Sequence, residues 1–97
     1  FFRSPSDIMA EAPPQGRAFR LGGLVESGSV ERGGEYQGRP AIRFAVTDGA
    51  NRIPVVFTGV LPDLFREGQG VVAEGVLGSD GVFRARVMVA GPAEIYT

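Results

Sequence analysis

The sequence predicts an all-β fold, a small partly open barrel of five to six strands with one short helix and flexible N- and C-terminal arms. Short runs of alternating apolar residues recur along the chain, and residues that favour turns separate them. One interval with helical spacing precedes the last two runs. This pattern is typical of a small barrel, and a length of 97 residues predicts one domain.

Residues 1–18 are predicted to form a flexible arm ahead of the barrel, which is expected over residues 19–90. Ser4 is a candidate N-cap and Pro5 a candidate first helical residue, so a short helix can start here. Pro13 and Pro14 would end such a helix, and the residues that follow are typical of a linker.

The first three strands are predicted between residues 19 and 57. The first runs over residues 19–26 and continues to residue 30, and the pair Gly22-Gly23 indicates a bend or the close approach of another strand. Apolar and more polar residues then alternate on both sides of a turn at residues 48–51, which predicts a hairpin. The apolar residues expected to face inward are Ile42, Phe44, Val46, Ile53, Val55 and Phe57.

The spacing changes to that of a helix over residues 61–68. Pro62 lies near the expected start of this helix, and Gly68 lies just past its end. Residues at positions i, i+3 and i+4 share one face of a helix, so this face would close one end of the barrel. The residues expected on it are Leu61, Leu64 and Phe65.

Two more strands are predicted after this helix, over residues 70–77 and from residue 83 onward. In the last strand the alternation predicts an inward set, Phe83, Ala85, Val87 and Val89, and an outward set, Arg84, Arg86 and Met88. Three strands, a helix and two strands, with a strongly bent first strand, are the connectivity of the OB-fold. Residues 91–97 would then begin a flexible C-terminal tail.

The composition argues against most kinds of catalysis. The chain has no cysteine and no histidine, so it lacks the usual zinc ligands and the commonest general base. No acid pair stands out either, and we expect a protein that is not an enzyme. Ten basic residues, all arginine, and eleven acidic residues give a net charge of −1. A duplex-binding module carries a clear positive excess instead.

An oligonucleotide-binding module is the alternative that the barrel class itself suggests, through basic grooves and stacked aromatic rings. Outward arginines could follow a phosphate backbone, or they could be ordinary solvated positions. The predicted inward register of Phe44, Phe57 and Phe83 leaves these rings unable to stack on bases. The sequence therefore disfavours nucleic acid as a partner. The outward arginines are Arg43, Arg52, Arg84 and Arg86.

Residues 59–75, GVLPDLFREGQGVVAEG, closely resemble the signature of the CcmE family, the periplasmic haem chaperones of cytochrome c maturation. The runs RLGG at 20–23, TDG at 47–49, FRA at 83–85 and SPS at 4–6 fit the same pattern. The resemblance covers nearly the whole chain and implies an OB-fold. It also implies a single N-terminal anchor that holds the full-length protein at the periplasmic face of the inner membrane.

The resemblance implies a function for the tail. Family members take haem from inner-membrane cytochrome c maturation proteins and pass it to the ligation machinery, and so indirectly to apocytochrome c. They attach haem through a vinyl group to a histidine in a motif like Lys-His-Asp-Glu-Asn-Tyr, whose tyrosine ligates the iron. Aligned without a gap, this motif matches Glu94 and Tyr96, and it places Pro92 at the histidine position. Tyr96 is thus the implied haem iron ligand.

Proline has no nucleophilic side chain, so Pro92 cannot form that covalent bond, and the chain has no histidine or cysteine to replace it. Three interpretations stay open: an altered chain, a natural member that binds haem non-covalently, or a paralogue with another partner. Non-covalent binding would use Tyr96 together with apolar surface such as Met88 and Ile95. We predict a CcmE-like haem carrier. The alternative is an OB-fold interaction or oligonucleotide-binding module that handles no haem.

Overall fold

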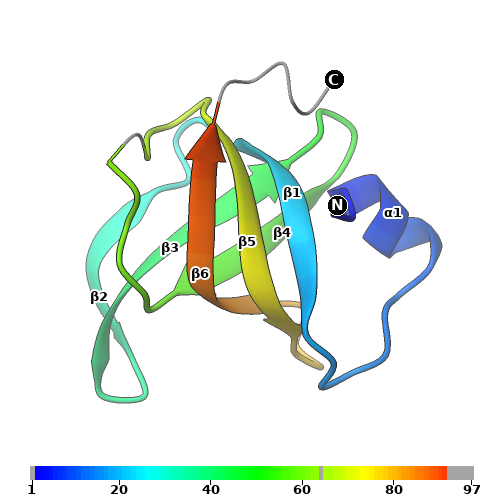
Figure 1. Cartoon of the computed structure of the whole chain (residues 1–97), viewed down its shortest axis with the longest axis horizontal. Coiled ribbons are helices and arrows are strands. Elements are labelled where there is room, and N and C mark those ends of the chain that lie inside the picture. Colours follow the sequence, from blue (N-terminus) through cyan, green and yellow to red (C-terminus); the bar gives the residue numbers. More distant parts are fainter. Residues whose placement is uncertain (1, 64, 92–97) are drawn as a thin grey trace.

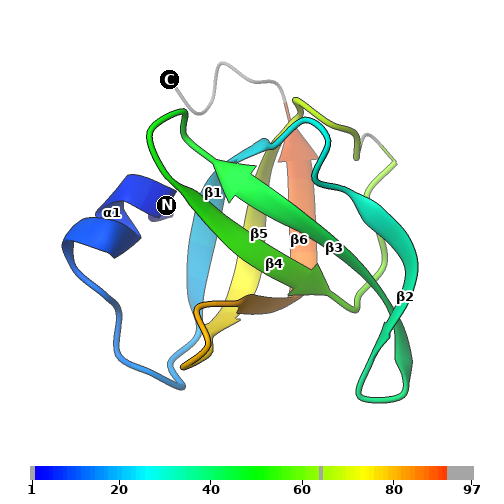
Figure 2. The same cartoon turned by 180° about the vertical axis from the view of Figure 1, so that it is seen from behind.

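The computed structural model describes residues 2–63 and 65–91. Six strands form one sheet in the order β1-β5-β6-β4-β3-β2, and a further pairing of β1 with β3 closes a five-stranded barrel that β2 extends (Figures 1 and 2). The predicted all-β OB-fold barrel is confirmed. The elements are α1 (Pro5–Ala10), β1 (Phe19–Val25), β2 (Glu31–Tyr36), β3 (Arg39–Thr47), β4 (Arg52–Phe57), β5 (Gly70–Leu77) and β6 (Phe83–Gly91).

Strand β1 pairs with β5 along most of its length and with β3 at its end. The close approach predicted at Gly22-Gly23 is confirmed there. A Cβ atom on Gly23 would lie 2.7 Å from the Thr47 carbonyl oxygen, so only glycine lets β3 come this near. Strand β2 was not predicted as a separate strand. The β2 sequence, ERGGEY, lacks the alternating apolar residues that would predict a strand. The strand forms because its backbone pairs with β3.

The barrel interior is filled by apolar side chains from all five barrel strands. The inward register of Phe44, Phe57 and Phe83 is confirmed, because these rings are 3%, 2% and 0% exposed. The hairpin between β3 and β4 is also confirmed, with its turn at residues 48–51. Burial of these aromatic rings contributes strongly to the stability of the core.

The helix predicted over residues 61–68 is not formed in the described part of that segment. Backbone groups near its end pair with β1 instead: Gly68 N–H donates to the Val25 carbonyl at 2.7 Å, and Val25 N–H donates to the Gln69 carbonyl at 2.9 Å. Phe65 nevertheless closes the barrel end as expected. It is 8% exposed, and its ring meets that of Phe44 edge to face at 5.1 Å. Leu64 lies outside the described residues.

The last strand contains a β-bulge. Gly75 of β5 pairs with Ala85, whereas the preceding Glu74 pairs with Val87, so Arg86 is an extra residue in β6. Beyond a bulge the alternation of side chains resumes one residue later, and each side chain moves to the opposite face of the sheet. The bulge therefore divides β6 into two segments with opposite registers.

The predicted directions of three side chains beyond the bulge are wrong for this reason. Val87 and Val89 were expected inside the barrel but are 55% and 63% exposed. Met88 was expected outside but belongs to the core, with 6% of its surface exposed. Before the bulge, Phe83 and Ala85 face inward as predicted.

The described part of the N-terminal arm lies against the barrel, with α1 beside β1 in Figure 1. The N-cap predicted at Ser4 is confirmed as a capping box, in which Ser4 Oγ accepts from Asp7 N–H and the Asp7 carboxylate accepts from Ser4 N–H. Ile8 is 5% exposed and belongs to the core. Flexibility of the arm stays a prediction.

Asp48 links this arm to the hairpin between β3 and β4. Its carboxylate accepts from the N–H groups of Ser6, Ala50 and Asn51 at 2.8, 3.1 and 2.9 Å. Partial burial alone would raise the pKa of Asp48, but hydrogen bonds from the Ser6 side chain and these backbone groups outweigh it and hold the pKa well below its usual range.

We expect Asp48→Asn to lower the free energy of unfolding at neutral pH by about 1 kcal/mol. The effect is small because solvent screens the charge of the exposed Asp48 carboxylate. The folded pKa lies below the unfolded value of about 3.9, so this stabilisation is present above about pH 4 and is lost as the pH falls toward the folded pKa. Urea unfolding at pH 7 and pH 3 checks this. The difference between parent and variant should shrink at pH 3, while the exposed control Asp63→Asn should show little difference at pH 7. An equal difference at both values would contradict the prediction.

Candidate functional site

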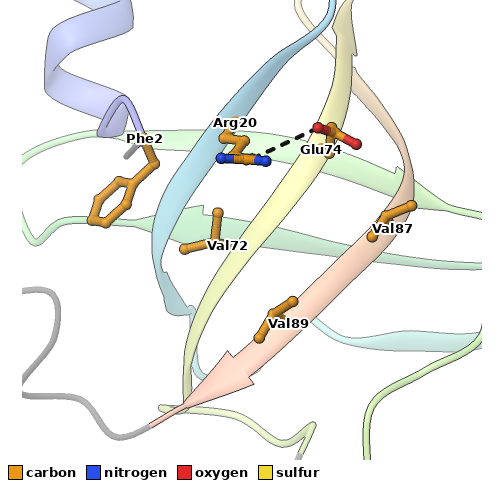
Figure 3. Close-up of a pocket in the computed structure, with 6 residues that line it drawn as sticks. All are labelled: Phe2, Arg20, Val72, Glu74, Val87 and Val89. Carbon is orange, nitrogen blue, oxygen red and sulfur yellow. Dashed lines mark ion pairs between the residues drawn. The ribbon is translucent and has the colours of Figure 1, made fainter.

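The outer face of β1, β5 and β6 carries an exposed apolar surface. Cross-strand pairing aligns its residues in three rows, because residues on one face of neighbouring strands lie side by side. The rows are Arg20–Glu74–Val87, Gly22–Val72–Val89 and Leu24–Gly70–Gly91. We call Val72, Val87 and Val89 the valine face. Figure 3 shows these three side chains on the same side of β5 and β6.

Phe2 borders the valine face. A Cβ atom on Gly22 would overlap the Phe2 ring, so the ring lies where a side chain would otherwise stand in the middle row. The lining residues Phe2, Val72, Val87 and Val89 enclose an open depression of about 340 Å³ together with Arg20 and Glu74. The third row adds only the partly buried side chain of Leu24, because Gly70 and Gly91 have none and are buried. The exposed apolar surface therefore consists of the first two rows, and it suits a largely apolar ligand.

Arg20 and Glu74 form the polar side of this depression. Their ion pair has an N–O distance of 3.6 Å, and both side chains are about half exposed, at 56% and 49%. Such a surface pair stabilises a protein by little, so either group can pair with a ligand at small cost. In Figure 3 this pair lies beside Val72, across β1 and β5.

The bulge at Arg86 creates the valine face. The alternation of residues in the sequence did not predict this face, because it gives no sign of an extra residue in β6. One signal was present in the sequence. Gly75 lies inside strand β5, and a glycine in the interior of a strand often marks a bulge or a close approach. A Cβ atom on Gly75 would collide with the Arg84 carbonyl oxygen and lie 2.8 Å from Ala85 Cα. The bulge therefore requires glycine at this position.

The predicted tail residues Pro92, Glu94 and Tyr96 lie outside the described residues, as does Ile95. Their roles stay predictions. The structure describes β6 as far as Gly91, whose carbonyl accepts a hydrogen bond from Gln69 Nε2. Strand β6 therefore ends two residues after Val89 of the valine face. Met88, which was expected to supply apolar surface for haem, is buried and does not contribute to this face.

The outward arginines are mostly engaged within the protein. Arg52 pairs with Glu26 at 2.9 Å, and Arg43 donates to the Glu35 carbonyl. Arg84 pairs with Asp80 at 2.9 Å. These partners favour the interpretation of Arg43, Arg52 and Arg84 as ordinary surface positions.

Arg84 is held firmly by two partners. It donates to the Asp80 carboxylate and to the Tyr36 hydroxyl, and its guanidinium also lies 5.6 Å from the centre of the Tyr36 ring. Hydrogen bonding to Asp80, and then to Tyr36, raises the pKa of Arg84. The pKa of Asp80 is lowered by the hydrogen bond that its carboxylate accepts from the Val82 N–H and, to a smaller extent, by the hydrogen bond from Arg84. The positive charge of Arg84 is thus fixed in place on the outer face of β6.

Within residues 2–63 and 65–91, acidic side chains do not gather into a group of three or more that could hold a metal ion. Among the residues that the structure describes, no helix is long and apolar enough to cross a membrane. Among the described residues, the exposed apolar surface next to the tail is thus the strongest candidate site.

The barrel and its exposed valine face define the class of protein, a small OB-fold domain with an open apolar surface. Two solved structures share the fold. The OB-fold domain of the haem chaperone CcmE from Desulfovibrio vulgaris matches with a TM-score of 0.62 and 29% identity, over 84% of this chain and 96% of that one. The telomere capping protein Ten1 from Saccharomyces pombe matches with a TM-score of 0.63 and 18% identity, over 92% of this chain and 78% of that one, which shows the fold alone.

The chain belongs to the CcmE family. The model of the CcmE domain matches residues 1–97. The cytochrome c-type biogenesis protein CcmE of Methylobacterium sp. (strain 4-46) is 59% identical over 96 residues, and that of Methylibium petroleiphilum is 55% identical. Both alignments cover 99% of this chain but only 56% and 59% of the relatives, so the chain spans a little over half their length.

Proposed function

We propose that this chain is the barrel domain of a haem chaperone that carries haem for cytochrome c maturation. The observation that carries the proposal is the valine face, which is exposed and lies on β6 shortly before that strand ends at Gly91. A porphyrin ring is planar and largely apolar, and it would bury the exposed surface of Val87 and Val89. Burying apolar surface contributes about 25 cal/mol per Å², which favours association without any covalent bond.

The tail is long enough to cover a ring bound on this face. Tyr96 follows Gly91 by five residues, so an extended tail reaches up to about 18 Å. Val87 precedes Gly91 by four residues of strand, a distance of about 13 Å. The tail can therefore fold back over the whole valine face. Tyr96 would then ligate the haem iron, as tyrosine does in some haem proteins.

Carriage in this chain is non-covalent under this proposal. Pro92 occupies the position where the family pattern has its attaching histidine, and proline offers no nucleophile. Glu94 is a weaker match to the motif and has no separate role assigned. The chain holds and releases its cargo and carries out no turnover chemistry of its own.

The proposed location is the periplasmic face of the inner membrane, with a single N-terminal anchor in the full-length protein. The proposed partners are the inner-membrane cytochrome c maturation proteins that donate and accept haem, and apocytochrome c indirectly. The similar proteins are named cytochrome c-type biogenesis proteins, which supports a role beside the cytochrome c maturation machinery. Nucleic acid is not a proposed partner, because Phe44, Phe57 and Phe83 are buried in the core and the chain carries a net charge of −1.

A titration with ferric haem, followed by visible absorbance, tests the proposal. We expect saturable binding by the parent and a changed iron spectrum in Tyr96→Phe, since the phenolate ligand is lost. Pro92→His should yield haem that stays attached after denaturation, whereas haem should dissociate from the parent. If the parent gives no spectral change and Pro92→His is equally inert, haem carriage is wrong for this chain.

A further inference from the structure

A second depression adjoins the valine face, and three arginines border it. It has a volume of about 650 Å³ and lies between the β2–β3 hairpin and the outer face of β4, β5 and β6. We call it the arginine groove after Arg39, Arg84 and Arg86, which line it together with Tyr36, Thr58 and Glu74. Glu74 and Val87 line both depressions, so the groove lies directly beside the valine face.

The groove is positively charged, although the chain carries a net charge of −1. Its three arginines face one acidic lining residue, Glu74, which already pairs with Arg20. Arg39 and Arg86 are exposed and form no ion pair or side-chain hydrogen bond with any residue that the structure describes. Arg84 is fixed by Asp80 and Tyr36. The groove thus combines one fixed guanidinium with two that have no protein partner there.

The bulge places the two surfaces end to end. Arg86, the extra residue of β6, lines the groove, and the next residue, Val87, begins the valine face. Along β6 the outer surface therefore changes from basic to apolar within one residue. A ligand that spans both surfaces would be complementary to them if one edge is anionic and the other is apolar.

Haem has this division, because its two propionate carboxylates lie on one edge of the ring and its vinyl groups lie toward the other. The geometry points to the arginine groove as the binding site of the haem propionates. Arg39 and Arg86 pair with the carboxylates, and the apolar edge lies over Val72 and Val89. Guanidinium groups suit this role because they can bind carboxylates through two parallel hydrogen bonds. This inference rests on the proposed haem-carrier function and adds the orientation of the bound ring.

The test compares ferric haem with its dimethyl ester, in which both carboxylates are neutralised. Each is titrated against the parent, against Arg39→Gln/Arg86→Gln, and against a control with the same change of charge, Arg17→Gln/Arg66→Gln, at exposed positions outside the groove. We expect the parent to bind haem roughly tenfold more tightly than the diester. The groove variant should lose about this factor for haem and nothing for the diester. The control should change neither dissociation constant by more than about twofold.

Equal binding of haem and diester by the parent would overturn the propionate site and leave haem carriage intact. So would an equal loss of both ligands in the groove variant, since the arginines would then act on the fold or on the valine face. Failure of the parent to bind either ligand would overturn both this inference and the proposed function. Urea unfolding of each variant shows whether it is folded under the conditions of the titration.

Discussion

Val89→Asp is expected to weaken ferric haem binding by roughly a hundredfold while the barrel stays folded. Val89 lies in the middle row of the valine face and is 63% exposed before any ligand binds. A porphyrin on this face would bury Val89, and a carboxylate there would have to lose its water without a partner. The lost burial and the added desolvation together amount to about 2–3 kcal/mol, which corresponds to a factor of about 30 to 150.

The matched control for this substitution is Val60→Asp. Val60 is 90% exposed and lies in the segment between β4 and β5, away from the residues that line the valine face. It should leave the haem dissociation constant unchanged, and both variants should unfold in urea close to the parent because exposed positions contribute little. If Val89→Asp binds haem as tightly as Val60→Asp, the valine face is not where haem lies.

Gly75→Ala is expected to lower the free energy of unfolding by about 2–3 kcal/mol, a large part of the stability of so small a domain. The added methyl group would collide with the Arg84 carbonyl and approach Ala85 Cα to 2.8 Å. Both are backbone atoms of β6, so the bulge must deform, and a rotating side chain cannot relieve the clash. Urea unfolding at neutral pH measures the change.

The matched control is Gly34→Ala in β2. A Cβ atom on Gly34 would lie 3.1 Å from Arg43 Nη1, the far end of a flexible side chain, which can move away. We expect the control to change stability by no more than about 0.5 kcal/mol. A Gly75→Ala variant that unfolds at the same urea concentration as the parent would show that the bulge does not depend on glycine.

Some features were predicted because neighbouring residues alone determine them. The N-cap at Ser4 and the β3–β4 turn at residues 48–51 depend on side chain to backbone hydrogen bonds a few residues apart. The close approach at Gly23 was predicted because few residues other than glycine tolerate it. The burial of Phe44, Phe57 and Phe83 follows from alternation in strands that are regular at those positions.

The incorrect predictions concern segments whose structure depends on pairing with another strand. Residues 61–68 have helical spacing, but their backbone near Gly68 pairs with Val25 of β1, more than forty residues earlier. Strand β2 has little apolar pattern of its own and exists because β3 offers its edge. Local propensity is a weak prior, and hydrogen bonds to a partner strand override it.

The sequence by itself determined the barrel class, the family resemblance and the residues of the tail motif, including proline at position 92. Only the tertiary structure decided which face of β6 is apolar. The alternation of Val87, Met88 and Val89 fits either register equally well, since shifting a strand by one residue exchanges its two faces. The close contact of Gly75 with Arg84 and Ala85 determines the register, because it allows one extra residue in β6. This extra residue directs Val87 and Val89 outward.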